Sequence, residues 1–168
     1  MKKIKRNGFT LIELLVVISV IGLLAALIMV NFNAARERAR DVQRKSDLDQ
    51  TKKALRMYYN DDSAYPLDDG EGRIMGCGNP PSETFEWGQE PFACGEMVYM
   101  KLLPQNPTWK EAGDPSYSYT RDASGQDFCL STALENKSDS DINDSQERCA
   151  SVCGAFDEDG GIYAVCAD

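Results

Sequence analysis

Residues 9–30 form an apolar run in which Glu13 is the only ionisable side chain. As an α-helix, these 22 residues extend for about 33 Å, enough to cross the hydrocarbon core of a bilayer. A cleaved secretory signal has a shorter apolar stretch and ends in small residues. Here the run continues into Asn31 and then into charged residues. We therefore predict one membrane helix over residues 9–32 that the chain retains.

The flanks of this run do not decide its orientation, but the cysteines do. The leader, residues 1–8, carries four basic residues and residues 36–45 carry five, so the positive-inside rule favours neither side. All six cysteines lie after residue 76, and an even number of distal cysteines indicates disulfides formed in an oxidising compartment. We expect a single-pass membrane protein with an extracytoplasmic head.

Composition excludes several classes of function. The chain has 168 residues, a formal net charge of −9 and no histidine. An acidic surface suits nucleic acid poorly. The absence of histidine excludes Ser-His-Asp triads and histidine-ligated metal sites. A hydrolase with two carboxylates needs no histidine, but among so many acidic residues such pairs arise by chance. We therefore predict a protein that is not an enzyme.

The residues Gly8-Phe9-Thr10-Leu11-Ile12-Glu13, between a basic leader and a long apolar helix, resemble the prepilin motif. That motif belongs to type IV pilins and to the pseudopilins of type II secretion and DNA-uptake systems. The similarity covers roughly the first 65 residues. It implies cleavage between Gly8 and Phe9 by a prepilin peptidase and N-methylation of Phe9. It also implies an inner-membrane assembly platform and other pilin copies as partners.

Glu13 is costly in a membrane helix, since a charged side chain at mid-bilayer costs up to about 2.5–3.5 kcal/mol on insertion scales. No basic side chain lies between Phe9 and Arg36, so the run itself offers no cation. Cleavage before Phe9 creates an N-terminal amine, and the resemblance implies that Glu13 pairs with the amine of a neighbouring copy. The alternative is that Glu13 only reaches the lipid headgroups.

The helix is predicted to continue beyond the membrane. Residues 33–59 contain no proline or glycine, and apolar or small residues recur in steps of 3 and 4, with one phase slip between Val42 and Leu48. Asp41–Lys45 and Asp49–Lys53 are spaced as i,i+4 ion pairs. Asn60 is the expected stop. We predict an amphipathic extension over residues 33–60, followed by a disulfide-containing head over residues 61–168.

The sequence of the head predicts an α+β fold of the pilin type, in which a small antiparallel sheet lies on the distal half of the long helix. Strands are expected over residues 116–120, 127–135 and 161–167, with a hairpin turn at 123–126. Residues 68–95 are rich in glycine and proline and read as a stapled loop. Residues 97–103 are expected to form one or two helical turns.

The six cysteines allow 15 pairings, and the sequence does not choose among them. Our working hypothesis is Cys77–Cys94, Cys129–Cys166 and Cys149–Cys153. A zinc site is the weaker interpretation, because the head is expected outside the cytoplasm.

Residues 138–147 are acidic and read mainly as a solvated loop. The oxygen ligands Asp139, Asp141, Asn143 and Asp144 could alternatively bind calcium, as the heads of some pseudopilins do. The EF-hand pattern is not met. No other cofactor is predicted.

Charge divides sharply along the chain. Residues 36–56 carry a net charge of +4 and residues 57–168 a net charge of −16. This division reads mainly as two solvated surfaces, and the alternative is that the basic stretch of one copy meets the acidic head of another. The predicted function is a structural subunit of a type IV pilus or pseudopilus. The alternative is a membrane-anchored binding protein that does not polymerise, and the sequence does not separate pilus from pseudopilus.

Overall fold

The computed structural model describes residues 9–77, 81, 83–108, 117–156 and 160–167, with only the backbone of residues 27–31. The leader and Gly8 therefore lie outside the described residues. The chain divides into two compact units, Met1–Glu37 and Arg38–Asp168. The division falls inside the segment predicted as the amphipathic extension. The fold is α+β, with a long N-terminal helix and small antiparallel sheets, as the sequence predicted.

Helix α1 spans Leu11–Asp62, 52 residues, close to the predicted limits. The predicted stop at Asn60 is two residues early. Ser63 adopts a left-handed conformation, with φ 59°, and its backbone N–H donates to the carbonyl of Tyr59 at 2.8 Å. A residue in this conformation turns the chain away from the helix axis and ends the helix.

The buried stripe of α1 in the second unit agrees with the predicted apolar face from Leu48 onward and differs from it before that residue. It consists of eight residues at helical spacing: Asp41, Arg44, Asp47, Leu48, Thr51, Ala54, Leu55 and Tyr58. Val42, which the sequence placed on the apolar face, is 66% exposed. The phase slip therefore marks the point where the apolar pattern leaves the buried face. Three charged residues, Asp41, Arg44 and Asp47, continue the stripe in its place.

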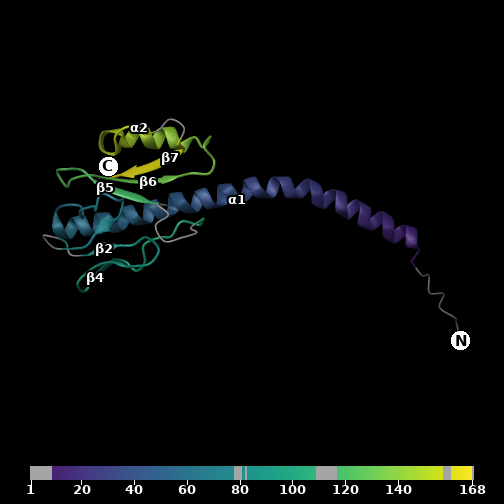
Figure 1. Cartoon of the computed structure of the whole chain (residues 1–168), viewed down its shortest axis with the longest axis horizontal. Helices are drawn as coiled ribbons and strands as arrows, with labels where there is room; N and C mark the ends of the chain where they lie inside the picture. The colour runs from purple at the N-terminus through teal and green to yellow at the C-terminus, as the bar shows by residue number, and fades with distance from the viewer. Residues whose placement is uncertain (1–8, 78–80, 82, 109–116, 157–159, 168) are drawn as a thin grey trace. The chain divides into compact units, whose positions relative to one another are not determined.

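A three-stranded antiparallel sheet forms the centre of the head, in the order β5-β6-β7. Its strands are β5 (Ser118–Arg121), β6 (Phe128–Ala133) and β7 (Ile162–Cys166). The three predicted strands and the hairpin between the first two are thus confirmed. Figure 1 shows α1 on one side of this sheet and α2 (Asp141–Cys153) on the other.

Alternation along β6 decides which side chains face which helix. Phe128 and Leu130 join the core that contains Leu48 and Leu55 of α1. Cys129 points the other way and packs with the cysteines of α2. Because successive side chains of a strand point to opposite faces, one short strand supplies both layers.

Helix α2 also covers the outer edge of β7. The side-chain oxygen of Ser145 accepts from the backbone N–H of Ala164 at 3.2 Å, and the Gln146 side-chain amide donates to the carbonyl of Ile162 at 2.8 Å. Uncovered edge strands invite pairing with other chains. The predicted solvated acidic loop is wrong at this position, because Asp141 and Asp144 form the first turn of a helix. Acidic residues suit that end of a helix, since they interact favourably with its dipole.

Two small hairpins occupy the segment predicted as a loop. One pairs β1 (Ile74–Met75) with β2 (Thr84–Phe85), and the other pairs β3 (Phe92–Cys94) with β4 (Met97–Met100). The predicted helical turns over residues 97–103 are therefore wrong. Gly95 has φ 61°, which allows the two-residue turn that reverses the chain between Cys94 and Met97.

The structure contains the predicted Cys77–Cys94 disulfide, but the other two predicted pairings are wrong. Cys129 bonds to Cys153 and Cys149 bonds to Cys166. Cys129 and Cys166 are register partners in the sheet, with both sulfurs on the face that α2 covers. Cys149 and Cys153 are one helical turn apart on α2, on the face toward the sheet. Each strand cysteine therefore meets a helix cysteine, and the two bonds attach α2 to the sheet.

These pairings predict a specific result from non-reducing digestion of the folded chain with trypsin and a protease that cuts before aspartate. Cleavage before Asp157 separates Cys149 and Cys153 from Cys166. One disulfide-linked group of three peptides should result, because the helix peptide is bonded to both strand peptides. A two-peptide product containing only Cys129 and Cys166 would contradict this connectivity.

Removing the Cys129–Cys153 bond by double serine substitution should lower the free energy of unfolding by about 3 kcal/mol.

Candidate functional site

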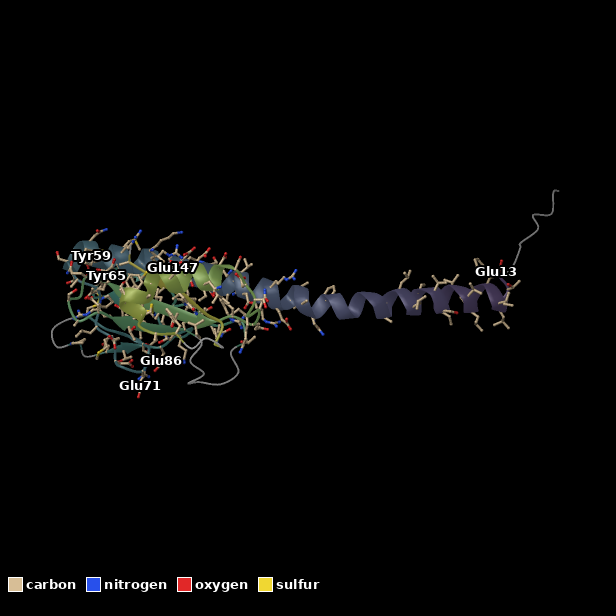
Figure 2. All side chains as sticks on the ribbon, turned by 90° about the horizontal axis from the view of Figure 1, so that it is seen from above. Glu13, Tyr59, Tyr65, Glu71, Glu86 and Glu147 are labelled. Carbon is tan, nitrogen blue, oxygen red and sulfur yellow. A yellow bond between two sulfur atoms is a disulfide. The ribbon has the colours of Figure 1, made fainter. Side chains whose placement is uncertain are left out.

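The first turn of α1 carries a reciprocal capping arrangement between Thr10 and Glu13. The backbone N–H of Thr10 donates to the Glu13 carboxylate at 2.8 Å, and the Thr10 hydroxyl donates to the same oxygen at 2.6 Å. The backbone N–H of Glu13 in turn donates to the Thr10 hydroxyl oxygen at 3.3 Å. This capping box satisfies polar groups that have no partner within the helix. Figure 2 shows Glu13 at this end of α1.

The capping box is a functional feature that the sequence interpretation missed, although its T-x-x-E pattern was present. It gives Glu13 a partner inside its own chain before any neighbour is present. The Gly8–Phe9 cleavage site begins outside the described residues, and Phe9 is exposed. The pairing of Glu13 with the Phe9 amine of another copy is a contact between chains, so it stays a prediction.

The apolar side chains of α1 from Leu11 to Leu24 have no cover from their own unit. The large ones are between 49% and 88% exposed, and they lie on all sides of the helix. An all-round apolar surface needs lipid or other protein around it. Within the residues that the structure describes, no helix meets the length and hydropathy needed to span a membrane.

A buried polar cluster fixes α1 to the head. Arg44 is 2% exposed, and its guanidinium bonds the carboxylates of Asp41 at 2.6 Å and Glu135 at 2.8 Å. Asp41 also accepts the backbone N–H groups of Glu135 and Asn136, each at 2.9 Å. Arg40 forms a second ion pair with Glu135. The predicted Asp41–Lys45 ion pair is wrong, because Asp41 pairs with Arg44 instead.

Replacing Arg44 with methionine should lower the free energy of unfolding by about 3–5 kcal/mol, since breaking a buried ion pair leaves carboxylates without their partner. Lys53→Met is the matched control: Lys53 is exposed on the same helix, and exposed substitutions stay within about 0.5 kcal/mol. Denaturant unfolding of the full chain in detergent measures both. Equal stability of the two variants would show that the cluster is not a stabilising element.

The same cluster predicts an acid limit to stability. Hydrogen bonds from Arg40, and to a smaller extent from Arg44, lower the pKa of Glu135 to about 2. They outweigh the burial of Glu135, which acts in the opposite direction. Because the pKa of Glu135 in the folded chain lies below its ordinary value, the ionised carboxylate stabilises the fold, and this stabilisation is fully present above about pH 4.5. It should be lost as the pH falls through about 2. Unfolding measured across this range should show a smaller pH dependence in Glu135→Gln than in the unsubstituted chain.

The four candidate calcium ligands do not form one site. Asp139 and Asp141 both pair with the Lys45 ammonium of α1, each at 2.7 Å. Burial lowers the pKa of Lys45, but the two carboxylates together have the larger effect, so the pKa is raised. Asn143 and Asp144 are exposed residues of α2. Among the described residues, no group of three or more acidic or cysteine side chains is placed to hold a metal ion.

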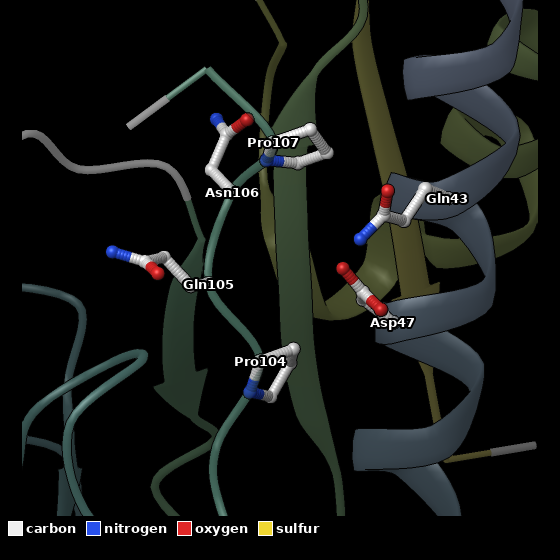
Figure 3. Close-up of a pocket in the computed structure, with 6 residues that line it drawn as sticks. All are labelled: Gln43, Asp47, Pro104, Gln105, Asn106 and Pro107. Carbon is white, nitrogen blue, oxygen red and sulfur yellow. The ribbon is translucent and has the colours of Figure 1, made fainter. Parts of the chain in front are cut away.

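An open groove of about 440 Å³ lies between α1 and the segment of residues 104–107. Figure 3 shows Gln43 and Asp47 pointing from α1 into this groove, with Pro104 and Pro107 on its other side. Asp47 is 9% exposed, and the Tyr117 hydroxyl donates to it at 2.6 Å. Burial raises the pKa of Asp47, and this effect exceeds the opposing one of the Tyr117 hydrogen bond.

Comparison with known proteins begins at the N-terminus. Residues 3–29 match the family described as the prokaryotic N-terminal methylation motif. This stretch contains Gly8, Phe9, Thr10 and Glu13. The matched segment is therefore the one that carries the capping box.

The similarity to individual relatives extends through the head. The type II secretion system core protein G of Aeromonas hydrophila is 31% identical over 141 residues, covering 84% of this chain and 92% of the relative. That of Pseudomonas aeruginosa is 31% identical over 149 residues, covering 86% and 95%. The type IV wide pilus major component PilA4 of Thermus thermophilus is 39% identical over 78 residues, covering 46% and 60%. This chain belongs to the type IV pilin and type II secretion pseudopilin family. No solved structure shows a significant match.

Proposed function

We propose that this chain is a structural subunit of a helical filament and that it assembles through the first half of α1. The observation that carries the proposal is the apolar surface of Leu11–Leu24, which is exposed on all sides and begins at the Thr10–Glu13 capping box. Each fully buried leucine, isoleucine or valine contributes about 1.5–3 kcal/mol. A sheath of other copies supplies that burial outside the membrane.

Before assembly, the chain is a membrane-inserted prepilin with an extracytoplasmic head. A prepilin peptidase removes residues 1–8 and Phe9 becomes the N-methylated first residue. Removal of the leader takes away four positive charges. The assembly platform of the inner membrane then transfers the subunit into a cell-surface or periplasmic filament of identical and related copies.

Glu13 changes partner during this transfer. In the single chain its carboxylate accepts two hydrogen bonds from Thr10, which keep it satisfied at the start of the helix. In the filament it pairs with the Phe9 amine of a neighbour, and a subunit in the wrong axial position leaves that charge buried without a partner. The pair therefore sets the stagger between copies, and the role requires no catalytic residue.

Between the two kinds of filament, the type II secretion pseudopilus is favoured. The two core protein G relatives align over most of this chain, whereas PilA4 aligns over 46% of it. The alternative is a membrane-anchored head that binds a ligand without polymerising. That alternative explains the anchor and the disulfides but does not account for a carboxylate, Glu13, in the apolar run.

Expression of the full chain with a prepilin peptidase and a type II assembly platform tests the proposal. Shearing, electron microscopy and labelling with an antibody to the head should find filaments of this chain. The mature subunit should begin at N-methylated Phe9. A processed chain that stays monomeric in the membrane with every platform tried would support the anchored-binder alternative instead.

A further inference from the structure

Asp47 is a buried carboxylate that has no cationic partner among the described residues. It is 9% exposed, and none of the ion pairs among the described residues includes it. One oxygen accepts the Tyr117 hydroxyl at 2.6 Å, while the side chain lines the groove beside Pro104 and Pro107 (Figure 3). Burying a charge is costly unless it is paired, so a carboxylate in this position attracts a cation.

The cations on the same face of α1 have other partners. Arg44, three residues before Asp47, directs its donors to Asp41, Glu135, Asn106 and Thr108. Lys45 pairs with Asp139 and Asp141. The remaining positions one turn from Asp47 are Gln43, Gln50 and Thr51, none of which is basic.

The groove fits the end of a long cationic side chain. Its opening admits a side chain from outside, and the proline rings of Pro104 and Pro107 offer an apolar wall for an aliphatic stem. Lys and Arg characteristically lay their stems on apolar surface and place the charge on a polar group. Asp47 supplies the acceptor at the α1 side of the groove.

A second copy carries cations of this kind. Arg36 and Arg38 are exposed, and the contact described for Arg36 is with the ring of Phe32 at 5.0 Å. They open the basic stretch of α1, whose net charge over residues 36–56 is +4, in a chain that is otherwise strongly acidic. We propose that the Asp47 groove receives an arginine, Arg36 or Arg38, from α1 of a neighbouring copy. This inference rests on the proposed filament function and identifies a contact that fixes the head of one copy on the helix of the next.

The test is Asp47→Asn in the full chain, with Asp49→Asn as the matched control. Asparagine keeps an oxygen for the Tyr117 hydroxyl and removes only the charge, so the melting temperature in detergent should stay the same or rise. Filament yield should fall at least about tenfold, as expected for the loss of one partner of a desolvated charge pair. Asp49 is an exposed carboxylate on the same helix, and its substitution should leave the yield unchanged.

A charge exchange identifies the partner. Arg36→Glu with Arg38→Glu should reduce the yield like Asp47→Asn, and adding Asp47→Arg to that chain should restore at least part of it. Wild-type yield from Asp47→Asn, or no rescue by the exchange, overturns the proposal. So does the same loss from Lys110→Gln, since Lys110 of the same chain, outside the described residues, would then be the cation. Failure of the unsubstituted chain to form filaments would instead refute the proposed function.

Discussion

Replacing Glu13 with alanine should leave a membrane-inserted chain with a folded, disulfide-bonded head that fails to enter filaments. Insertion should become easier, because a carboxylate is removed from the apolar run. Assembly should suffer because the neighbour's Phe9 amine is left without its partner in a low-dielectric bundle. A loss of about 3 kcal/mol or more for a broken buried pair corresponds to a reduction of more than about a hundredfold in subunit association. Sheared filament yield, normalised to chain level in the membrane, measures it.

Glu13→Gln is the control that separates the two roles of this side chain. Glutamine can still accept the Thr10 hydrogen bonds of a capping box, but it carries no charge. If charge pairing between copies is the essential role, glutamine should fail nearly as severely as alanine. Thr10→Ala removes the hydroxyl part of the cap and should weaken the helix start by about 1 kcal/mol. Normal filaments from Glu13→Gln would make capping, and not pairing, the function of this residue.

Replacing Gly8 with valine should block processing. Glycine has no Cβ, so the backbone at the scissile bond can approach the protease closely, whereas a β-branched side chain obstructs it. The uncut chain should accumulate with its four positive leader charges, which hold the N-terminus at the cytoplasmic face of the membrane. Without the cut there is also no Phe9 amine to pair with Glu13, so filaments should be absent.

Intact-mass analysis of the membrane fraction distinguishes the two states of the Gly8 variant. A mass that includes residues 1–8 is expected for valine. Gly8→Ala adds a single methyl group and should be cut at an intermediate rate. A Gly8→Val chain that still begins at N-methylated Phe9 would show that the cleavage assignment is wrong.

The N-terminal helix could be predicted well because its signals are local. A long apolar run without proline dictates a helix, and the structure ends that helix two residues past the predicted stop. The Thr10–Glu13 cap was equally local, in a T-x-x-E pattern directly before an apolar run. The sequence interpretation did not include it, because it assigned Glu13 a partner in another chain or in the lipid headgroups and none in its own helix.

The buried face of α1 in the head could not be predicted from apolar periodicity. Arg44 is among the largest fully buried side chains, and its burial depends on Asp41, Glu135 and Asn106. Two of these partners lie more than sixty positions away in the sequence. The partners of the basic stretch, residues 36–56, could not be predicted for the same reason. Three of its cations, Arg40, Arg44 and Lys45, form ion pairs within their own chain. The exposed arginines at 36 and 38 are among the cations that remain available for contacts between copies.

Two of the three predicted disulfide pairings were wrong for a related reason. In the structure, Cys129 and Cys166 lie on neighbouring strands and Cys149 and Cys153 lie one helical turn apart, but neither pair is bonded. What decides the pairing is that α2 packs over the sheet, so both sets point toward each other. The helix itself was not predicted, because its first turn is acidic and resembles a solvated loop.

The most direct test of the assembly account is a cryo-electron microscopy map of the filament at side-chain resolution. The account predicts that the Glu13 carboxylate of each copy lies within about 4 Å of the Phe9 amine of a neighbour, the usual limit for an ion pair. The Thr10 hydroxyl should no longer be its main partner. A filament in which Glu13 remains bonded to Thr10 of its own chain, with the Phe9 amine elsewhere, would contradict the account.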